Sequence, residues 1–315
     1  MSLSVGIVGL PNAGKSTLFN ALAARRLAET APRPFTTIEP HEAVVPVSDE
    51  RLEKLSALVK PERIVPATVT FIDIAGLVKG AAKGEGLGNQ FLAKIREVNA
   101  IIHVVRGFGD PAVSHPHPAF EPGSLEQMLE DIEIVNLELL LGGIEKKPTI
   151  YLLNLAEQKV TDESKNQLMN TVKQKFGGEV VAVSAKLEEE LIDLEPDERR
   201  QYLTEVGVQE SGLEQTIRKA YELLKLITFY TIKGGKEVHA WSLKQGSTAI
   251  QAAAEVHTDF ARKFIKAEVI GVDELLSVGS WKEAKEKGKI RLEGKDYIVQ
   301  DGDVVEIVIG GGRRE

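Results

Sequence analysis

Along the first two thirds of the chain, short apolar runs alternate with longer stretches that have helical spacing. Residues 3–9 (LSVGIVG) and 67–74 (ATVTFIDI) are rich in β-branched residues and predict buried strands. Further runs of this kind lie at residues 100–105, 148–154 and 179–185. Helical spacing occupies residues 17–26, 88–98 and 123–141, the last with Ser124 as a candidate N-cap. Strands that alternate with helices predict an α/β fold with a doubly wound, mostly parallel sheet.

The pattern changes after residue 226. Short apolar runs separated by glycine-bearing turns lie at residues 227–232, 237–243, 267–272 and 303–309. One stretch with helical spacing, residues 247–264, lies among them. This arrangement is typical of a small α+β domain. We therefore expect two domains, residues 1–226 and residues 227–315.

Composition excludes several classes of protein. Apolar residues make up 43% and charged residues 27% of the chain, as in ordinary globular proteins. No apolar run approaches the roughly 20 residues of a membrane helix, and the N-terminal MSLSVGIVGL lacks a basic region, so we expect neither a membrane span nor a signal peptide. The absence of cysteine excludes disulfides, a thiol nucleophile and cysteine-ligated metals, and fits a cytoplasmic protein.

Residues 9–16 (GLPNAGKS) match G-x-x-x-x-G-K-S between a predicted strand and a predicted helix. In such a loop the glycines let backbone N–H groups surround phosphate oxygens, and Lys15 contacts the β- and γ-phosphates. The Ser16 hydroxyl is a ligand of Mg²⁺. The expected nucleotide-binding residues of the loop are Asn12, Ala13, Gly14, Lys15, Ser16 and Thr17, with Lys15 also acting in catalysis.

Two further segments have the order expected after a phosphate loop. Asp73 and Gly76 form D-x-x-G at the end of a predicted strand, so Asp73 is expected to hold Mg²⁺ through water and the Gly76 N–H to face the γ-phosphate. Between the two motifs, residues 34–38 (PFTTI) are a candidate switch segment, and Thr37 is favoured to complete the Mg²⁺ shell. The alternative for Thr37 is a capping residue in a surface loop.

A third segment lies where a GTPase has Asn-Lys-x-Asp, and here it runs from Asn154 to Glu157 as NLAE. Glu157 is one methylene longer than the aspartate that accepts from guanine, so the sequence predicts loss of guanine selectivity. That loss alone does not select adenine. Asn154 could accept from the adenine 6-amino group, and Leu155 could cover the ring face. After the next predicted strand, the backbone of Ser184, Ala185 and Lys186 is expected to approach the base.

The succession GLPNAGKS, PFTTIEPH, DIAGLVKGAAKGEGLGNQFL, NLAE and VSAKLEEEL resembles the Obg-like ATPases, the YchF family of translation-factor-related P-loop proteins. Residues 240–270 and 301–309 resemble its ubiquitin-like TGS domain, so the resemblance covers nearly the whole chain. It implies Mg²⁺, ATP preferred over GTP, and slow hydrolysis of ATP linked to the ribosome or a ribosomal subunit, in translation or stress regulation. We expect a monomer.

The residue after D-x-x-G is Leu77, which cannot orient the attacking water as a glutamine does. The resemblance aligns a family histidine near the γ-phosphate with His115, while His117 is a weaker candidate. The alternatives are a surface histidine and an enzyme that hydrolyses slowly without one. The resemblance also implies that Asn12 helps to hold K⁺, although Asn12 could simply shape the turn.

The chain departs from the family between the helix of residues 123–141 and the next strand. Family members carry a long helical arm there, whereas this chain has only residues 137–148, so partners that dock on the arm are in doubt. The net charge of −8 lies entirely in residues 1–228, so RNA contact through the TGS-like domain would need a local patch. The candidate patch is Arg262, Lys263, Lys266, Lys282, Lys285, Lys287 and Lys289. Interleaved acidic residues make a solvated helix face the alternative.

Three hypotheses follow. The first is an ATPase that acts as a slow switch, the second is a binding protein gated by nucleotide with negligible turnover, and the third is a GTPase or a switch that binds both ATP and GTP. Competition between the two bases and the effect of His115→Ala on turnover separate them.

Overall fold

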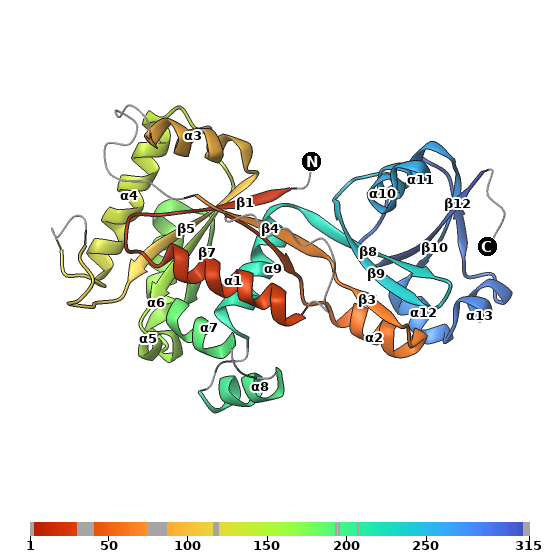
Figure 1. Cartoon of the computed structure of the whole chain (residues 1–315), viewed down its shortest axis with the longest axis horizontal. Helices are drawn as coiled ribbons and strands as arrows, with labels where there is room; N and C mark the ends of the chain where they lie inside the picture. Colours follow the sequence, from red (N-terminus) through yellow and green to blue (C-terminus); the bar gives the residue numbers. More distant parts are fainter. Residues whose placement is uncertain are drawn as a thin grey trace. The chain divides into compact units, whose positions relative to one another are not determined.

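The structure is a computed structural model, shown in Figure 1. It describes residues 3–29, 41–74, 87–115, 120–192, 194, 196–206, 208 and 210–310. The chain forms two compact units. The first comprises Met1–Val45 and Val69–Leu224, and the second comprises Pro46–Thr68 and Lys225–Glu315.

The first unit is built on a six-stranded sheet with the order β2-β4-β1-β5-β6-β7. Its strands are β1 (Ser4–Val8), β2 (Glu42–Pro46), β4 (Thr68–Asp73), β5 (Ala100–Gly107), β6 (Thr149–Leu155) and β7 (Glu179–Val183). From β4 to β7 all neighbours are parallel. The edge strand β2 runs antiparallel to β4, because Asp73 N–H donates to the His41 carbonyl and Val47 N–H to that of Ala67. The predicted fold class is confirmed, with an edge strand that the apolar pattern did not predict.

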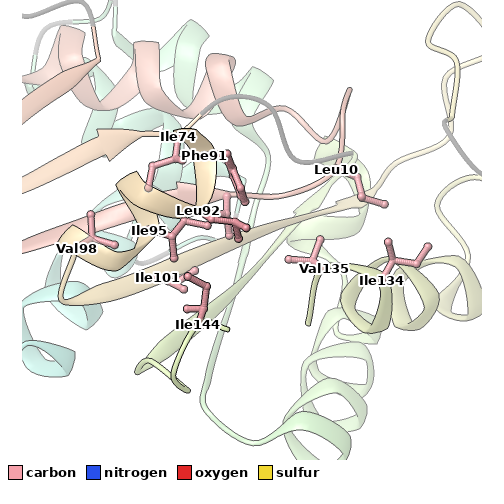
Figure 2. Close-up of a cluster of buried hydrophobic side chains, with 11 residues drawn as sticks. Leu10, Ile74, Phe91, Leu92, Ile95, Val98, Ile101, Ile134, Val135 and Ile144 are labelled. Carbon is pink, nitrogen blue, oxygen red and sulfur yellow. The ribbon is translucent and has the colours of Figure 1, made fainter. Parts of the chain in front are cut away.

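Helices cover this sheet on both faces. They are α1 (Lys15–Glu29), α3 (Leu87–Glu97), α4 (Leu125–Leu141), α5 (Glu157–Thr161), α6 (Ser164–Phe176), α7 (Ala185–Ile192), α8 (Pro196–Glu205) and α9 (Gly212–Leu223). Figure 2 shows one buried cluster, in which Leu10 of the phosphate loop and Ile74 after β4 pack with Phe91 of α3 and Val135 of α4. This core therefore packs against the carboxyl ends of β1 and β4, where a nucleotide site is expected.

The connection from α4 to β6 is short. Ser124 caps α4 by accepting from the Gln127 N–H at 3.2 Å, as predicted. The helix ends at Leu141, and Gly142 packs so closely on Leu92 that a Cβ there would lie 2.5 Å from it. Residues 142–148 then lead directly into β6, so this part of the chain contains no helical arm.

The second unit holds another six-stranded sheet, with the order β11-β10-β12-β8-β9-β3. Its strands are β3 (Arg63–Val65), β8 (Leu226–Lys233), β9 (Glu237–Lys244), β10 (Phe264–Gly271), β11 (Arg291–Glu293) and β12 (Asp303–Ile309). Its helices are α2 (Glu50–Val59), α10 (Ala249–Val256), α11 (Thr258–Arg262), α12 (Val272–Val278) and α13 (Trp281–Glu286). The helix predicted over 247–264 is thus two helices, because His257 is extended and caps the second.

Residues 46–68 correct the expected domain boundaries, because they were assigned to the first domain and lie in the second unit. β3 pairs with β9, and Leu55 of α2 is buried in one core cluster with Tyr230 and Ile270. Arg51 bonds Asp301 at 2.6 Å. A sequence pattern assigns a segment to its neighbours along the chain, whereas this segment is held by contacts with residues about 170 to 250 positions later.

The basic residues proposed for RNA contact are mostly paired. Six of the seven form ion pairs with acidic side chains of the second unit, all but Lys263. These ion pairs fit the alternative of a solvated helix face, and RNA contact through the patch stays a prediction. Within the described ranges, no helix has the length and apolar character needed to cross a membrane.

Candidate functional site

The phosphate loop lies between β1 and α1, and two glycines are required by its geometry. Gly9 has φ +151°, and a Cβ there would lie 2.3 Å from the Val104 carbonyl oxygen. Gly14 has φ +94°, and its Cβ would lie 2.2 Å from Asn154 Nδ2. Both positions combine a backbone conformation that favours glycine with a close approach to a residue of a neighbouring strand.

Lys15 and Asp73 supply opposite charges beside this loop. The Lys15 ammonium donates to the Leu10 carbonyl at 2.9 Å. Burial lowers the pKa of Lys15, and the nearby Asp73 charge opposes that shift only in part.

The residues expected to hold Mg²⁺ fit a hard cation as far as they are described. Asp73 Oδ1 is buried and has no hydrogen-bond partner among the described residues, and Ser16 is exposed in the first turn of α1. A carboxylate and a hydroxyl are oxygen donors of the kind that Mg²⁺ prefers. Thr37 and Gly76 lie outside the residues that the structure describes.

At the end of β6, Asn154 forms hydrogen bonds with the phosphate loop and with the turn after β7. Its Nδ2 donates to the Ala13 carbonyl of the phosphate loop at 2.9 Å, and its Oδ1 accepts from the Ala185 N–H at 3.0 Å. Asn154 is 5% exposed. An amide has a second lone pair and a second N–H, so the expected contact with the adenine 6-amino group stays a prediction.

A pocket of about 360 Å³ opens beside Asn154. Its lining includes eight predicted site residues, namely Gly14, Thr17, Asn154, Leu155, Glu157, Ser184, Ala185 and Lys186. It also includes Phe108, Gly109, Asp110 and Pro111 from the loop after β5, which sequence reasoning missed. The volume lies in the lower range for small-molecule sites. The structure therefore brings the phosphate loop, the base-motif residues and the turn after β7 to one pocket.

Two residues expected at the base differ in their surroundings. Leu155 is 2% exposed and packs in a core cluster with Met128 and Ile132, and it also lines the pocket, so the expectation that it covers a base stays a prediction. Glu157 is exposed at the start of α5 and accepts from the Tyr202 hydroxyl at 3.3 Å. Partial desolvation and the Glu157 carboxylate raise the pKa of Tyr202.

His115 is buried in this structure. Its Nε2 lies 3.1 Å from Asp131 Oδ2 of α4, and its side chain is 2% exposed. Gln127 donates to the same oxygen. Burial raises the pKa of Asp131, while the contact with His115 opposes that rise. The imidazole is thus held against α4 and does not line the pocket, and His117 lies outside the described residues.

Asn12 connects the phosphate loop to the segment that carries His115. It has φ +63°, and its Nδ2 donates to the Ser114 carbonyl at 3.1 Å. Its expected role in holding K⁺ stays a prediction. Sequence reasoning also missed Arg106, which is 1% exposed at the end of β5 and bonds the backbone of this segment. The sequence shows Arg106 only as an arginine inside an apolar strand run, which does not indicate what its side chain bonds.

These features define a nucleotide-binding P-loop protein with the fold of GTPases. They are a phosphate loop whose turns require glycine, an aspartate at the end of β4, and a pocket lined by Asn154. A family model described as a 50S ribosome-binding GTPase matches residues 4–155. A model for the C-terminal region of YchF GTPases, described as a protein of unknown function, matches residues 226–309.

The Ribosome-binding ATPase YchF of Bacillus subtilis strain 168 is 41% identical over 368 aligned positions, which cover 97% of this chain and 98% of the relative. The protein of the same name from Escherichia coli O157:H7 is 40% identical, with 98% and 99% covered. The solved YchF GTPase of Schizosaccharomyces pombe matches with a TM-score of 0.81 at 28% identity and covers 98% of both chains.

The chain therefore belongs to the YchF family of P-loop nucleotide hydrolases. The alignment with the B. subtilis relative has 368 positions against 315 residues here, so at least 53 positions have no residue in this chain. This agrees with the short connection between α4 and β6.

Proposed function

We propose that the protein binds ATP with Mg²⁺, hydrolyses it slowly to ADP and phosphate, and uses the nucleotide state as a switch in translation. The observation that carries the proposal is the pocket beside Asn154, which joins a complete phosphate loop to a base site with Glu157 in place of the guanine-binding aspartate. The names of the relatives, which are called ATPases, also support adenine as the base.

The preference for ATP rests on where the Glu157 carboxylate lies. Guanine presents two donors, N1–H and the 2-amino group, that a suitably placed carboxylate accepts together. Glu157 is a methylene longer, and its Oε1 accepts from Tyr202. A guanine would leave its donors unpaired or would have to draw Glu157 away from Tyr202, whereas adenine has no such donors to satisfy.

Slow turnover follows from the position of His115. Mg²⁺, when bound by Ser16 and Asp73, would neutralise phosphate charge and hold the β- and γ-phosphates with Lys15. His115 can orient the attacking water only after it leaves Asp131, because its imidazole is buried there. If His115 acts in this way, His115→Ala abolishes turnover and leaves ATP affinity unchanged. Equal turnover in wild type and His115→Ala would contradict the catalytic role and favour a nucleotide-gated binding protein.

The proposed partner is the ribosome or a ribosomal subunit in the cytoplasm, since relatives of nearly full coverage are named ribosome-binding. The chain lacks a helical arm between α4 and β6. Co-sedimentation of the protein with separated ribosomal subunits, with ATP, with ADP and without nucleotide, tests this partner. Pelleting that is equal in all three conditions, or absent, would contradict a nucleotide-controlled ribosome contact.

The base is tested by titrating nucleotide-stripped protein with ATP and with GTP, in Mg²⁺ and either K⁺ or Na⁺. We expect ATP to bind at least tenfold more tightly, about 1.4 kcal/mol. Glu157→Asp shortens the side chain and is expected to raise GTP affinity, while Glu133→Asp on α4, outside the pocket lining, serves as a control for the same chemical change. GTP affinity equal to or above that of ATP in the wild type would replace the ATPase proposal by a GTPase.

A further inference from the structure

Arg106 is a buried cation at the carboxyl end of β5, and all its described bonds go to one loop. Its Nε donates to the Phe108 carbonyl at 3.1 Å, and Nη1 donates to that of Ser114 at 3.1 Å. Nη2 donates to the carbonyls of Asp110 at 3.3 Å and Val113 at 3.0 Å. Arg106 is 1% exposed, so these carbonyls, with the nearby carboxylates of Asp110 and Asp131, stabilise its charge.

The loop that Arg106 holds contacts two parts of the nucleotide site. Its first residues, Phe108 to Pro111, form one wall of the pocket beside Asn154, and the guanidinium lies 4.7 Å from the centre of the Phe108 ring. Its last residue, Ser114, accepts from Asn12 of the phosphate loop. His115 follows directly and is bonded to Asp131.

We propose that Arg106 is a positioning residue for the nucleotide. By bonding four carbonyls between residues 108 and 114, it fixes the wall of the base pocket before ATP binds. The same bonds fix the position of the Ser114 carbonyl, which accepts from Asn12. They also fix the point in the chain from which His115 would extend to the γ-phosphate. The role of His115 rests on the proposed function, whereas the pocket wall does not depend on which base binds.

An arginine is required by this geometry. Its planar guanidinium carries five N–H donors on three nitrogens, and here all three nitrogens donate to separate parts of the loop. A lysine has three donors on a single nitrogen and cannot reach carbonyls on both sides of the fork. Arg106→Lys therefore keeps the charge and leaves part of the loop unbonded.

The test compares Arg106→Lys with Arg96→Lys in the full chain. Arg96 also donates to a backbone carbonyl, that of Gly142 at 2.8 Å, but on α3 and outside the pocket lining. We expect Arg106→Lys to raise the dissociation constants of ATP and GTP at least tenfold and Arg96→Lys to leave both within twofold. A dissociation constant for Arg106→Lys within twofold of the wild type would overturn the proposal.

A second arm separates positioning from simple loss of stability. Arg106→Lys is expected to lower kcat at saturating ATP when His115 is present, beyond its effect on KM. In a His115→Ala background, which is expected to have no turnover, Arg106→Lys should raise the dissociation constant of ATP by the same factor as it does with His115 present. An unchanged kcat at saturating ATP contradicts the positioning of His115. Should Arg106→Lys fail to fold, hydrogen exchange in the wild type decides. Amides of Ala112 and Val113 that exchange freely before ATP is added show that the loop bonded by Arg106 is not fixed, and protected amides support the proposal.

Since both nucleotides are titrated, this result is independent of the base preference. Tighter binding of GTP by the wild type would refute the ATPase assignment, and the comparison of Arg106→Lys with Arg96→Lys would still decide the role of Arg106.

Discussion

Replacing Leu55 by alanine tests whether residues 46–68 belong to the second unit. Leu55 lies on α2 and has no exposed surface. It packs in one cluster with Tyr230, Val238 and Ile270, all from the C-terminal part of the chain. Leu55→Ala should therefore destabilise the second unit, although these partners lie about 175 to 215 positions away in sequence, and leave the nucleotide site intact.

The expected loss follows from the burial of the side chain. Removing a fully buried leucine side chain costs about 2–5 kcal/mol, because transfer free energy is lost and a cavity remains. With a loss of about 3 kcal/mol and an m-value of about 1.5 kcal/mol/M, the urea midpoint of the second unit falls by about 2 M.

Tryptophan fluorescence provides the assay. The chain has two tryptophans, Trp241 and Trp281, and both lie in the second unit. Leu22→Ala in α1 is the matched control, since Leu22 also has no exposed surface but lies in the first unit. We expect Leu55→Ala to lower the urea midpoint of the tryptophan transition and Leu22→Ala to leave that midpoint unchanged. The ATP affinity of Leu55→Ala should stay within twofold of the wild type. An unchanged tryptophan midpoint for Leu55→Ala would refute the reasoning.

Three further outcomes are expected. Gly14→Ala abolishes nucleotide binding in a titration of the folded protein, because its Cβ would lie 2.2 Å from Asn154 Nδ2 at a φ of +94°. Asn154→Ala removes both loop ties and raises the ATP dissociation constant about ten- to a hundredfold, about 1.4–2.7 kcal/mol. Although burial favours a neutral Glu268, hydrogen bonds from Lys285 and Lys266 lower the pKa of this carboxyl. Glu268→Gln is thus expected to lower the free energy of unfolding in urea at pH 7. The difference in this free energy between wild type and variant should vanish as the pH falls through the lowered pKa of Glu268. Nucleotide binding by Gly14→Ala would contradict the first expectation, and an unchanged ATP affinity of Asn154→Ala the second. A stability difference between Glu268→Gln and the wild type that persists in acid would contradict the third.

The first sheet was predictable apart from its edge strand β2, because the other strands are largely buried and appear as continuous apolar runs. The segment of residues 46–68 was not. Its strand β3 has three residues, and its helix α2 presents Leu52 and Leu55 to a core that forms only with distant strands. Such a helix has the right period, but the period carries no information about which sheet it covers.

The candidate site divides in the same way. The phosphate loop and Asp73 could be found because motif spacing reflects local geometry. The Phe108–Pro111 wall and Arg106 could not, because no spacing shows that an arginine in an apolar run turns back on the loop that follows it. The contact of Glu157 with Tyr202 joins residues 45 positions apart and is likewise invisible to a local pattern.

The structure explains why the base motif keeps its first residue and not its last. Asn154 bonds Ala13 and Ala185, so it is needed to join the phosphate loop to the turn after β7 whichever base is bound. Glu157 makes no such tie and lies exposed at the start of α5. A change there alters which base edge is satisfied without disturbing the loops that hold the phosphates. Base choice can therefore change at position 157 while phosphate binding is preserved, which is the division that the proposed preference for ATP on the fold of a GTPase requires.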